Sequence, residues 1–450
     1  MNDIAGIPYT EAAFDKDGKL LNDPKLPNGI TDLIVISHGW LNNQADAERL
    51  YTDLMTNFVR VTRGDSAIER RKLAIIGVLW PSKQLDIAMT QPAASTKQAG
   101  GAASVGAVEP ADLQQAMNLA INRAAEVFDE PGELEQLEKL RSLTPQLENE
   151  AQAQIDFIGA LRKMLDPDGS KADMQSSDDA SDKFFEGNPA DIFANARLAA
   201  PASAVDSVLP EAPVSSEQAV GEGTGQAASF ASVMSGAANA VANLLNLTTY
   251  FKMKMRAGTV GSKGVAPLID RLGPQVERIH LVGHSFGGRL VTAAATDSQI
   301  SKVHSLSLLQ AAFSHNGFSR SRNGFFRKLI DKKRVAGPVL ITLSKFDRSV
   351  GLAYPAASRI NGDKAQAFGG ADDEFGGIGS NGAQHMDEGE IFNGAPTMLD
   401  VGGAYQFRGG KLHNLESSAF IVDPVDPRRD AHGFVYVPQV AWAISRALIF

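Results

Sequence analysis

The stretch Arg278-Ile-His-Leu-Val-Gly-His-Ser-Phe-Gly-Gly-Arg289 decides the fold that this sequence predicts. It begins with a short apolar run, typical of a buried strand, and from Gly288 onward it follows a helical pattern. Between the two lies Gly283-His284-Ser285-Phe286-Gly287, the G-x-S-x-G pattern in which a serine stands on a tight turn from strand to helix. The sequence therefore predicts Ser285 as a nucleophile above the end of a strand.

The alternative interpretation is a glycine-rich connection without chemistry, because a chain with 42 glycines produces such a pattern by chance. The position of the motif, between a predicted strand and a predicted helix, favours catalysis. The backbone N–H of Phe286 would open that helix, where amide dipoles stabilise a developing negative charge.

Composition restricts the classes of function. A length of 450 residues allows about three domains or one elaborated α/β domain. The net charge of −9 disfavours nucleic acid as a partner, because nothing offsets phosphate repulsion globally. The absence of cysteine excludes disulfides, thiolate metal sites and a cysteine nucleophile.

The first residues lack a basic region followed by an apolar core, so no secretory signal is visible. No apolar run approaches the length of a membrane span, which predicts no transmembrane segment. We therefore expect a soluble, cytoplasmic protein, with export without a cleaved signal as the alternative.

Alternating strands and helices predict a parallel sheet. Residues 32–37 form an apolar strand, 44–60 a helix with one apolar face, and 72–80 a second strand that ends at Pro81. This spacing is typical of a βαβ unit. After the Ser285 motif, 303–309 and 337–344 are predicted strands.

The last elements are predicted at the end of the sequence, after an irregular, glycine-rich region over 360–413. We expect Ser418–Val422 to be the final strand and Gln439–Phe450 a terminal helix. At the start of the chain, residues 1–29 are mixed and rich in turns, and Asp15-Lys-Asp-Gly18 is predicted as a hairpin turn between short strands.

Residues 82–250 have a different character and are predicted as an insertion. Helical patterns cover 110–165 and about 230–255, whereas 166–230 is polar or low in complexity. The joints at 90–109 and 200–229 have flexible compositions. We expect an insertion that acts as a lid over the site, and a decorative or partner-docking arm is an equal alternative.

A serine hydroxyl needs a base, and the base needs a third group that fixes its tautomer. With the chain order serine, acid, histidine, the acid should follow a later strand. Asp347 follows the strand at 337–344 and is the predicted acid, with Asp423 second and Asp430 third.

The base should lie between the last strand and the last helix, where His432 is the only histidine. His413 precedes the predicted last strand and is less well placed, and His284, beside the serine, is expected to be structural. A second oxyanion donor is expected from the backbone N–H of Trp40, in the loop after the first strong strand. The alternative role for Trp40 is packing of its ring on the core.

These motifs together resemble the α/β-hydrolase superfamily. His38-Gly39-Trp40, Trp80-Pro81-Ser82 and Gly283–Arg289 are similar to motifs of its bacterial serine-esterase-like members. The resemblance covers about half of the chain, roughly 30–82, 265–347 and 417–450. It implies an α/β-hydrolase fold, a mostly parallel sheet flanked by helices. Residues 1–81 and 251–450 would form this core, with the large, mostly helical insertion of 82–250 between them.

The resemblance also implies a role for each site residue. Ser285 would be the nucleophile, Asp347 the acid and His432 the base, and the backbone amides of Phe286 and Trp40 would form the oxyanion hole. The sequence departs from the superfamily in one respect, because lids there are most often inserted after the strand that follows the Ser285-type turn. Here the largest insertion precedes that turn.

The leading hypothesis is a serine hydrolase that cleaves carboxylic esters through an acyl-enzyme, with a small-molecule or lipid ester as substrate. A lipase or phospholipase, a thioesterase, an acyltransferase and a peptidase remain alternatives, because the same triad serves all of them. A non-catalytic binding protein, whose insertion docks a protein partner, is the competing class. No cofactor or metal is implied, because the histidines and carboxylates show no ligand spacing such as H-E-x-x-H.

Overall fold

A computed structural model gives the architecture of the chain. It describes residues 2–40, 42–82, 110–167, 169, 184–198, 236–300, 303–350, 376–394, 396–427 and 429–450. The predicted flexible joints at 90–109 and 200–229 lie outside these residues.

One mostly parallel sheet forms the centre of the molecule. Its eight strands have the order β1-β2-β4-β3-β5-β6-β7-β8. Strand β1 is antiparallel to β2, and each other neighbouring pair is parallel. The carboxyl ends of β2 to β8 therefore meet at one edge, where open α/β sheets bind their ligands. The strands are β1 (Asn2–Ile4), β2 (Ile7–Ala13), β3 (Asp32–Ser37), β4 (Leu73–Leu79), β5 (Arg278–His284), β6 (Val303–Leu309), β7 (Val339–Leu343) and β8 (Leu412–Glu416).

Strand β3 shows why the central strands read as continuous apolar runs. Leu33 and Val35 belong to one hydrophobic cluster, and Ile34 and Ile36 belong to another on the opposite face of the sheet. A strand covered on both faces needs no polar alternation. The strands predicted at 32–37, 72–80, 279–282, 303–309 and 337–344 are confirmed with ends that shift by at most two residues.

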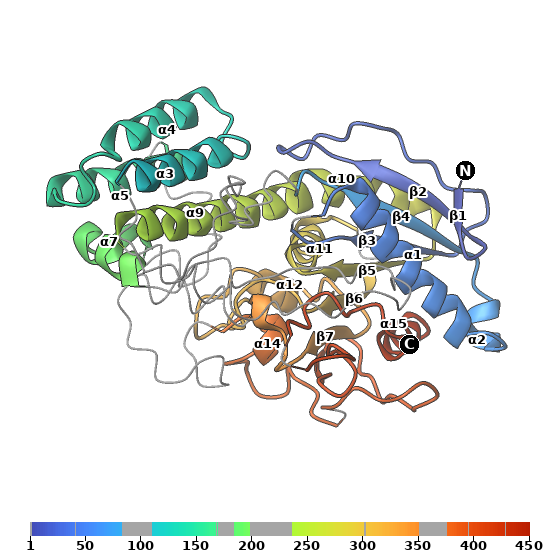
Figure 1. Cartoon of the computed structure of the whole chain (residues 1–450). Coiled ribbons are helices and arrows are strands. Elements are labelled where there is room, and N and C mark those ends of the chain that lie inside the picture. Colours follow the sequence, from blue (N-terminus) through green and yellow to red (C-terminus); the bar gives the residue numbers. More distant parts are fainter. Residues whose placement is uncertain are drawn as a thin grey trace, which may run out of the picture.

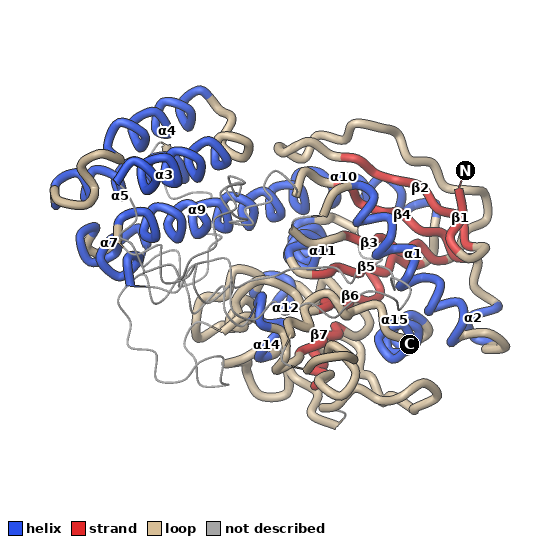
Figure 2. Tube along the Cα trace, viewed as in Figure 1, coloured by secondary structure: helices blue, strands red, loops and turns tan. Residues whose placement is uncertain are grey.

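Helices cover both faces of the sheet (Figure 2). On one face, α1 (Gln44–Val61) packs against α15 (Pro438–Leu448), and both contact the sheet. On the other face, α11 (Phe286–Asp297) lies against β3, β5 and β6. The predicted helices at 44–60 and 439–450 are thereby confirmed. Shorter helices are α2 (Ser66–Glu69), α10 (Ala266–Leu272), α12 (Arg327–Asp331), α14 (Ile378–Asn381) and the 3₁₀-helix Gly273–Gln275.

The inserted residues contain a group of helices beside the sheet (Figure 1). These are α3 (Pro110–Ala124), α4 (Pro131–Leu143), α5 (Ala151–Leu165) and α7 (Pro189–Leu198). Helix α9 (Ala237–Thr259) packs on α3, α5 and α7 and also on α11, so it joins this group to the sheet. A π-helix, Val260–Val265, continues α9 and packs on α11. The helical character predicted for 110–165 is confirmed.

Helix α7 lies inside the stretch predicted to be polar and low in complexity. Packing stabilises this helix, because Ile192, Phe193 and Ala196 are buried and the helix contacts α5 and α9.

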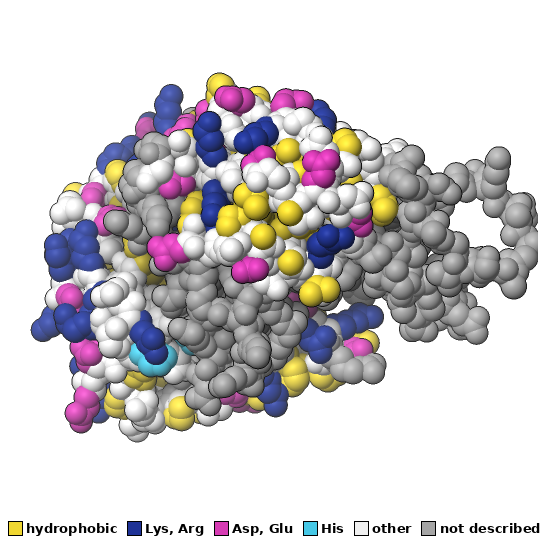
Figure 3. All heavy atoms as spheres, turned by 90° about the vertical axis from the view of Figure 1, so that its left-hand side faces the viewer, with side chains coloured by type: hydrophobic (Ala, Val, Ile, Leu, Met, Phe, Trp, Pro, Cys, Tyr) yellow, Lys and Arg dark blue, Asp and Glu magenta, His cyan; other side chains and the backbone are white. Residues whose placement is uncertain are grey.

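The surface of the helical group is mixed in character. Figure 3 views the molecule from the side of this group, where hydrophobic side chains lie among acidic and basic ones. Exposed hydrophobic residues include Leu119, Leu134 and Leu198, which belong to α3, α4 and α7. Within the described ranges, no helix combines the length and the hydropathy that crossing a bilayer requires.

The prediction of the last strand is wrong. The structure places the last strand at β8, Leu412–Glu416, and 418–422 forms a turn instead. The apolar run at 418–422 is explained by Ile421, which is buried in the cluster beneath α1 and α15. Residues 7–13 form strand β2 next to β4. The hairpin turn predicted at 15–18 is confirmed, since Phe14 pairs antiparallel with Leu20 across it.

Candidate active site

Ser285 stands at the turn between β5 and α11 with φ 56° and ψ −126°. A positive φ costs a non-glycine residue on the order of 1–3 kcal/mol and persists where the surroundings hold it. Both backbone groups of Ser285 are held here. Its N–H donates to the Leu309 carbonyl at 3.1 Å, and its carbonyl accepts from the Ala312 N–H at 3.0 Å. The predicted strand-to-helix turn is confirmed.

Glycines allow the backbone to close around the serine. A Cβ atom at Gly283 would lie 2.3 Å from the Gly287 carbonyl oxygen, and one at Gly287 would lie 2.3 Å from the Ser37 carbonyl oxygen. A Cβ at Gly39 would lie 2.6 Å from Ser285 Cβ and 3.1 Å from Ser285 Oγ. The loop after β3 therefore lies directly against Ser285, because residue 39 has no side chain.

The loop that carries Gly39 is held by the residues that follow β4. The His38 ring stacks on Trp80, with centroids 5.6 Å apart and planes 11° from parallel. Trp80 Nε1 donates to the His38 carbonyl at 3.1 Å, and Ser82 Oγ donates to the Asn42 carbonyl at 2.8 Å. The two motifs at 38–40 and 80–82 are thus one structural unit that fixes the loop beside Ser285.

Asp347 and His432 form a buried pair at the same edge of the sheet. Asp347 follows β7, and His432 lies in the loop before α15. His432 Nδ1 lies 3.1 Å from Asp347 Oδ1 and 3.0 Å from Oδ2. A carboxylate only accepts, so Nδ1 carries the proton and Nε2 is left as a base. The Val350 N–H also donates to Asp347 Oδ1, at 2.9 Å.

The pair shifts the pKa of each partner. Burial alone would lower the pKa of His432, but the charge and hydrogen bond of Asp347 outweigh burial and raise it above the usual 6.5. Burial raises the pKa of Asp347, and the His432 charge and hydrogen bond oppose that rise. A histidine with a raised pKa and a free Nε2 can accept a proton from an alcohol.

The serine and the histidine are not hydrogen-bonded to each other among the residues that the structure describes. His284 precedes Ser285, and its ring centroid lies 4.7 Å from that of His432. Ser285 follows β5, and the Asp347–His432 pair lies at the same edge of the sheet.

The alternative acids and histidines have other partners. Asp430 accepts from the backbone N–H groups of Arg348 and His432, and Asp423 accepts from those of residues 425 and 426. Asp423 does not follow a strand, since 418–422 is a turn. His413 lies inside β8 rather than before the last strand, and its Nε2 accepts from the Arg408 N–H.

His284, expected to have a structural role, is hydrogen-bonded to the loop that carries His432. Its Nε2 donates to the His432 carbonyl at 3.0 Å. Burial, reinforced by the charge of His432, lowers the pKa of His284 to about 3. The ring is therefore neutral and supports the loop that carries His432.

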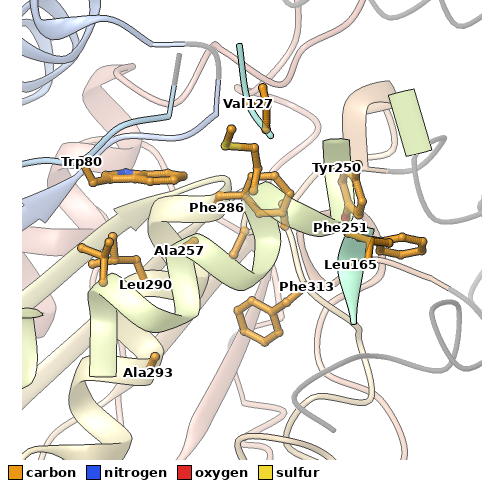
Figure 4. Packing of buried hydrophobic residues seen from close by; sticks show 14 of the residues in the cluster. Trp80, Val127, Leu165, Tyr250, Phe251, Ala257, Phe286, Leu290, Ala293 and Phe313 are labelled. Carbon is orange, nitrogen blue, oxygen red and sulfur yellow. The ribbon is translucent and has the colours of Figure 1, made fainter. Parts of the chain in front are cut away.

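Aromatic rings gather beside the turn at Ser285. The Trp40 ring lies 6.0 Å from that of Phe286 and 6.1 Å from that of Tyr250, and the Tyr250 and Phe286 centroids are 5.1 Å apart. Figure 4 shows Phe286 of α11 next to Tyr250 and Phe251 of α9. The Trp40 ring packs on the core, as the alternative interpretation proposed. Phe286 is the first residue of α11, so its N–H has no intrahelical acceptor.

A second set of serine, histidine and aspartate occurs inside the sheet. His280 Nδ1 lies 2.9 Å from Ser305 Oγ, and His280 Nε2 lies 3.1 Å from Asp32 Oδ1. All three residues are at most 2% exposed, and Ser305 lies within strand β6. This set links three neighbouring strands and gives a substrate no access.

Two residues near the site, Tyr250 and Gln310, belong to no motif of the sequence. Tyr250 appeared only within a helical pattern. Gln310 follows β6 directly, and its Nε2 donates to Asp347 Oδ2 at 3.1 Å. A polar residue at the carboxyl end of a central strand was the available clue.

Among the described residues, no group of three or more histidine, aspartate or glutamate side chains is arranged to hold a metal ion. Comparison with known proteins gives no match to a protein-family model, a curated protein or a solved structure.

Proposed function

We propose that this chain is a serine hydrolase of the α/β-hydrolase superfamily that cleaves carboxylic esters through an acyl-enzyme. One observation carries the proposal. A serine held at positive φ between a parallel strand and a helix shares its sheet edge with a buried aspartate–histidine pair. The acid follows β7 and the base follows β8, which is the chain order that this chemistry uses in the superfamily.

In this proposal, His432 Nε2 removes the proton from Ser285 Oγ as Oγ bonds to the ester carbonyl carbon. The tetrahedral intermediate then expels the alcohol, which takes the proton from His432. Water, deprotonated by the same Nε2, attacks the acyl group and releases Ser285. Asp347 stays ionised throughout, holds the Nδ1–H tautomer and stabilises the imidazolium.

The proposed oxyanion hole consists of the backbone N–H groups of Phe286 and Trp40. The absence of a side chain at Gly39 supports this assignment, because it lets the loop after β3 approach Ser285 Oγ. Each donor of this kind is typically worth about 3 kcal/mol of transition-state stabilisation.

The experiment that tests the function is labelling with a fluorophosphonate. We expect the wild-type protein to be labelled at Ser285 and to hydrolyse p-nitrophenyl esters, and the Ser285→Ala variant to do neither. Ser305→Ala is the matched control, because it removes the serine of the buried set and should keep both properties. Absence of labelling in the folded wild-type protein would favour a non-catalytic binding protein instead.

The insertion is proposed to shape access to the site. The support is Tyr250, which α9 places against Trp40 and Phe286. We expect Tyr250→Ala to change the ratio of hydrolysis rates on short and long acyl esters, with Tyr250→Phe close to the wild type. An unchanged ratio in Tyr250→Ala would favour a docking arm or a decoration. The same panel, extended to thioesters and phospholipids, separates esterase, thioesterase and lipase activity.

A further inference from the structure

Gln310 occupies an unusual backbone position next to the site. It is fully buried and has φ 44°, although it is not glycine. Leu309 and Ala312, on either side of it in the chain, each form a backbone hydrogen bond to Ser285. A strained residue that the surroundings hold in place is a reason to look for a function.

The side chain of Gln310 is hydrogen-bonded at both ends. Nε2 donates to Asp347 Oδ2 and to the Gly379 carbonyl, each at 3.1 Å. Oε1 accepts from Thr342 Oγ1 at 2.8 Å, and Thr342 Oγ1 in turn accepts from the Gln310 N–H at 3.0 Å. Asp347 Oδ2 is also the oxygen that lies 3.0 Å from His432 Nδ1.

These partners allow one orientation of the carboxamide. Rotation by 180° would direct Oε1 at a carboxylate and a carbonyl, which are both acceptors, and would leave Nε2 facing a hydroxyl. The backbone at Gly379 fits closely around this residue, since a Cβ there would lie 2.5 Å from the Gln310 carbonyl carbon. The amide N–H is therefore fixed on the carboxylate.

We propose that Gln310 is a positioning residue that orients the Asp347 carboxylate toward His432 and shares its negative charge. This inference rests on the proposed function for its catalytic meaning, but the contacts themselves do not depend on it. Because burial disfavours the ionised form of Asp347, an N–H donor at Oδ2 helps to keep the carboxylate charged. Gln310 connects the segment that holds Ser285 to the acid, so one residue couples the two halves of the site.

The proposal predicts a change in the titration of His432. The groups that face its ring are Asp347 after β7, Asp430 in its own loop and His284 at the end of β5. Without the Gln310 N–H, the Asp347 carboxylate places more of its charge on the Nδ1–H of His432. The pKa of His432 should then rise further.

The test compares Gln310→Met, which keeps the size of the side chain and removes the amide, with the wild-type protein. We expect the NMR titration of the His432 ring, assigned with a His432→Gln variant, to move to higher pH by several tenths of a unit or more. Gln384→Met is the matched control. It removes a 2.7 Å hydrogen bond to the Asn381 carbonyl in the same region without contact to Asp347, so it should leave the titration unchanged.

The kinetic result should follow the titration. In Gln310→Met we expect kcat/KM to fall about 10- to 100-fold, with its acid limb displaced to higher pH, because the base is protonated more easily and less well aligned. Thr342→Val, which removes the hydroxyl that orients the amide, should move the titration in the same direction by less. If Gln310→Met does not fold, the His432 titration in Thr342→Val tests the proposal instead.

An unmoved His432 titration in a folded Gln310→Met protein overturns the proposal, and so does an equal shift in Gln384→Met. The titration needs no substrate. Failure of the wild type to react with a fluorophosphonate would therefore refute the proposed function while the role of Gln310 is judged separately.

Discussion

Replacing Gly39 with alanine adds one methyl group at the point where the loop after β3 meets Ser285, the proposed nucleophile. The new Cβ would lie 2.6 Å from Ser285 Cβ and 3.1 Å from Ser285 Oγ. Carbon atoms in contact prefer about 3.5–4.0 Å, so the loop and the serine must separate by roughly 1 Å. A displacement of about 1 Å at a reacting centre costs on the order of 100-fold in rate. That factor corresponds to about 2.7 kcal/mol of transition-state stabilisation.

The assay is the second-order rate of fluorophosphonate labelling, measured together with kcat/KM for p-nitrophenyl acetate. We expect both rates to fall about 100-fold in Gly39→Ala. Gly159→Ala is the matched control, since its new Cβ in α5 has nothing within 4 Å. It should retain activity and gain about 0.5–1 kcal/mol of stability from better helix propensity. Wild-type rates in a folded Gly39→Ala protein would refute the contact between the loop and the nucleophile.

Three further predictions concern the ionisable groups. Asp347→Asn should lower turnover on the order of 10⁴-fold, as in well-studied triads, whereas Asp423→Asn should stay near the wild type; the reverse ranking in an esterase assay would move the acid. The value of kcat/KM should rise with pH as His432 loses its proton, with a midpoint above 6.5 because Asp347 raises that pKa; a flat profile from about pH 5 to 9 with chemistry limiting would exclude a histidine base. Burial lowers the pKa of His38 to about 4. Burial and the charge of His432 lower the pKa of His284 to about 3. Below pH 6.5 the unfolded chain therefore binds more protons at these two histidines than the folded chain does. The free energy of unfolding should therefore fall from pH 6.5 toward pH 4 by a few kcal/mol, partly opposed by His432, and urea titrations that show no such loss would contradict the neutral rings.

The central strands could be predicted because both faces of the sheet are covered. Their residues form uninterrupted apolar runs, and these runs need only local information to be recognised. Strand β8 lacks such a run, because His413 and Asn414 interrupt it. These polar side chains form hydrogen bonds to backbone groups outside the strand, His413 Nε2 with the Arg408 N–H and Asn414 with the N–H and carbonyl of residue 383. A pattern of hydrophobic residues in the sequence does not reveal hydrogen-bond partners of this kind.

In the candidate site, too, some residues could be predicted from the sequence and others could not. Ser285 has a local signature in its glycines, and Asp347 has a position that follows from chain order. Gln310 has neither. Its hydrogen bond with Thr342 forms only when β6 and β7 pair and bring the two residues together. Asp32, His280 and Ser305 show that residue types alone are not enough. They are hydrogen-bonded to one another, but they are buried where no substrate can reach them.

The Asp347–His432 pair has a consequence for a chain that is being synthesised. His432 follows Ser285 by 147 residues (432 − 285), and its loop leads directly into α15, which packs on α1. Translation proceeds from the N-terminus, so Ser285 leaves the ribosome long before His432 is made. Under the proposed function, a nascent chain that ends before His432 would carry a serine without its base. Any hydrolytic activity would then begin only when the first and last long helices of the core come together.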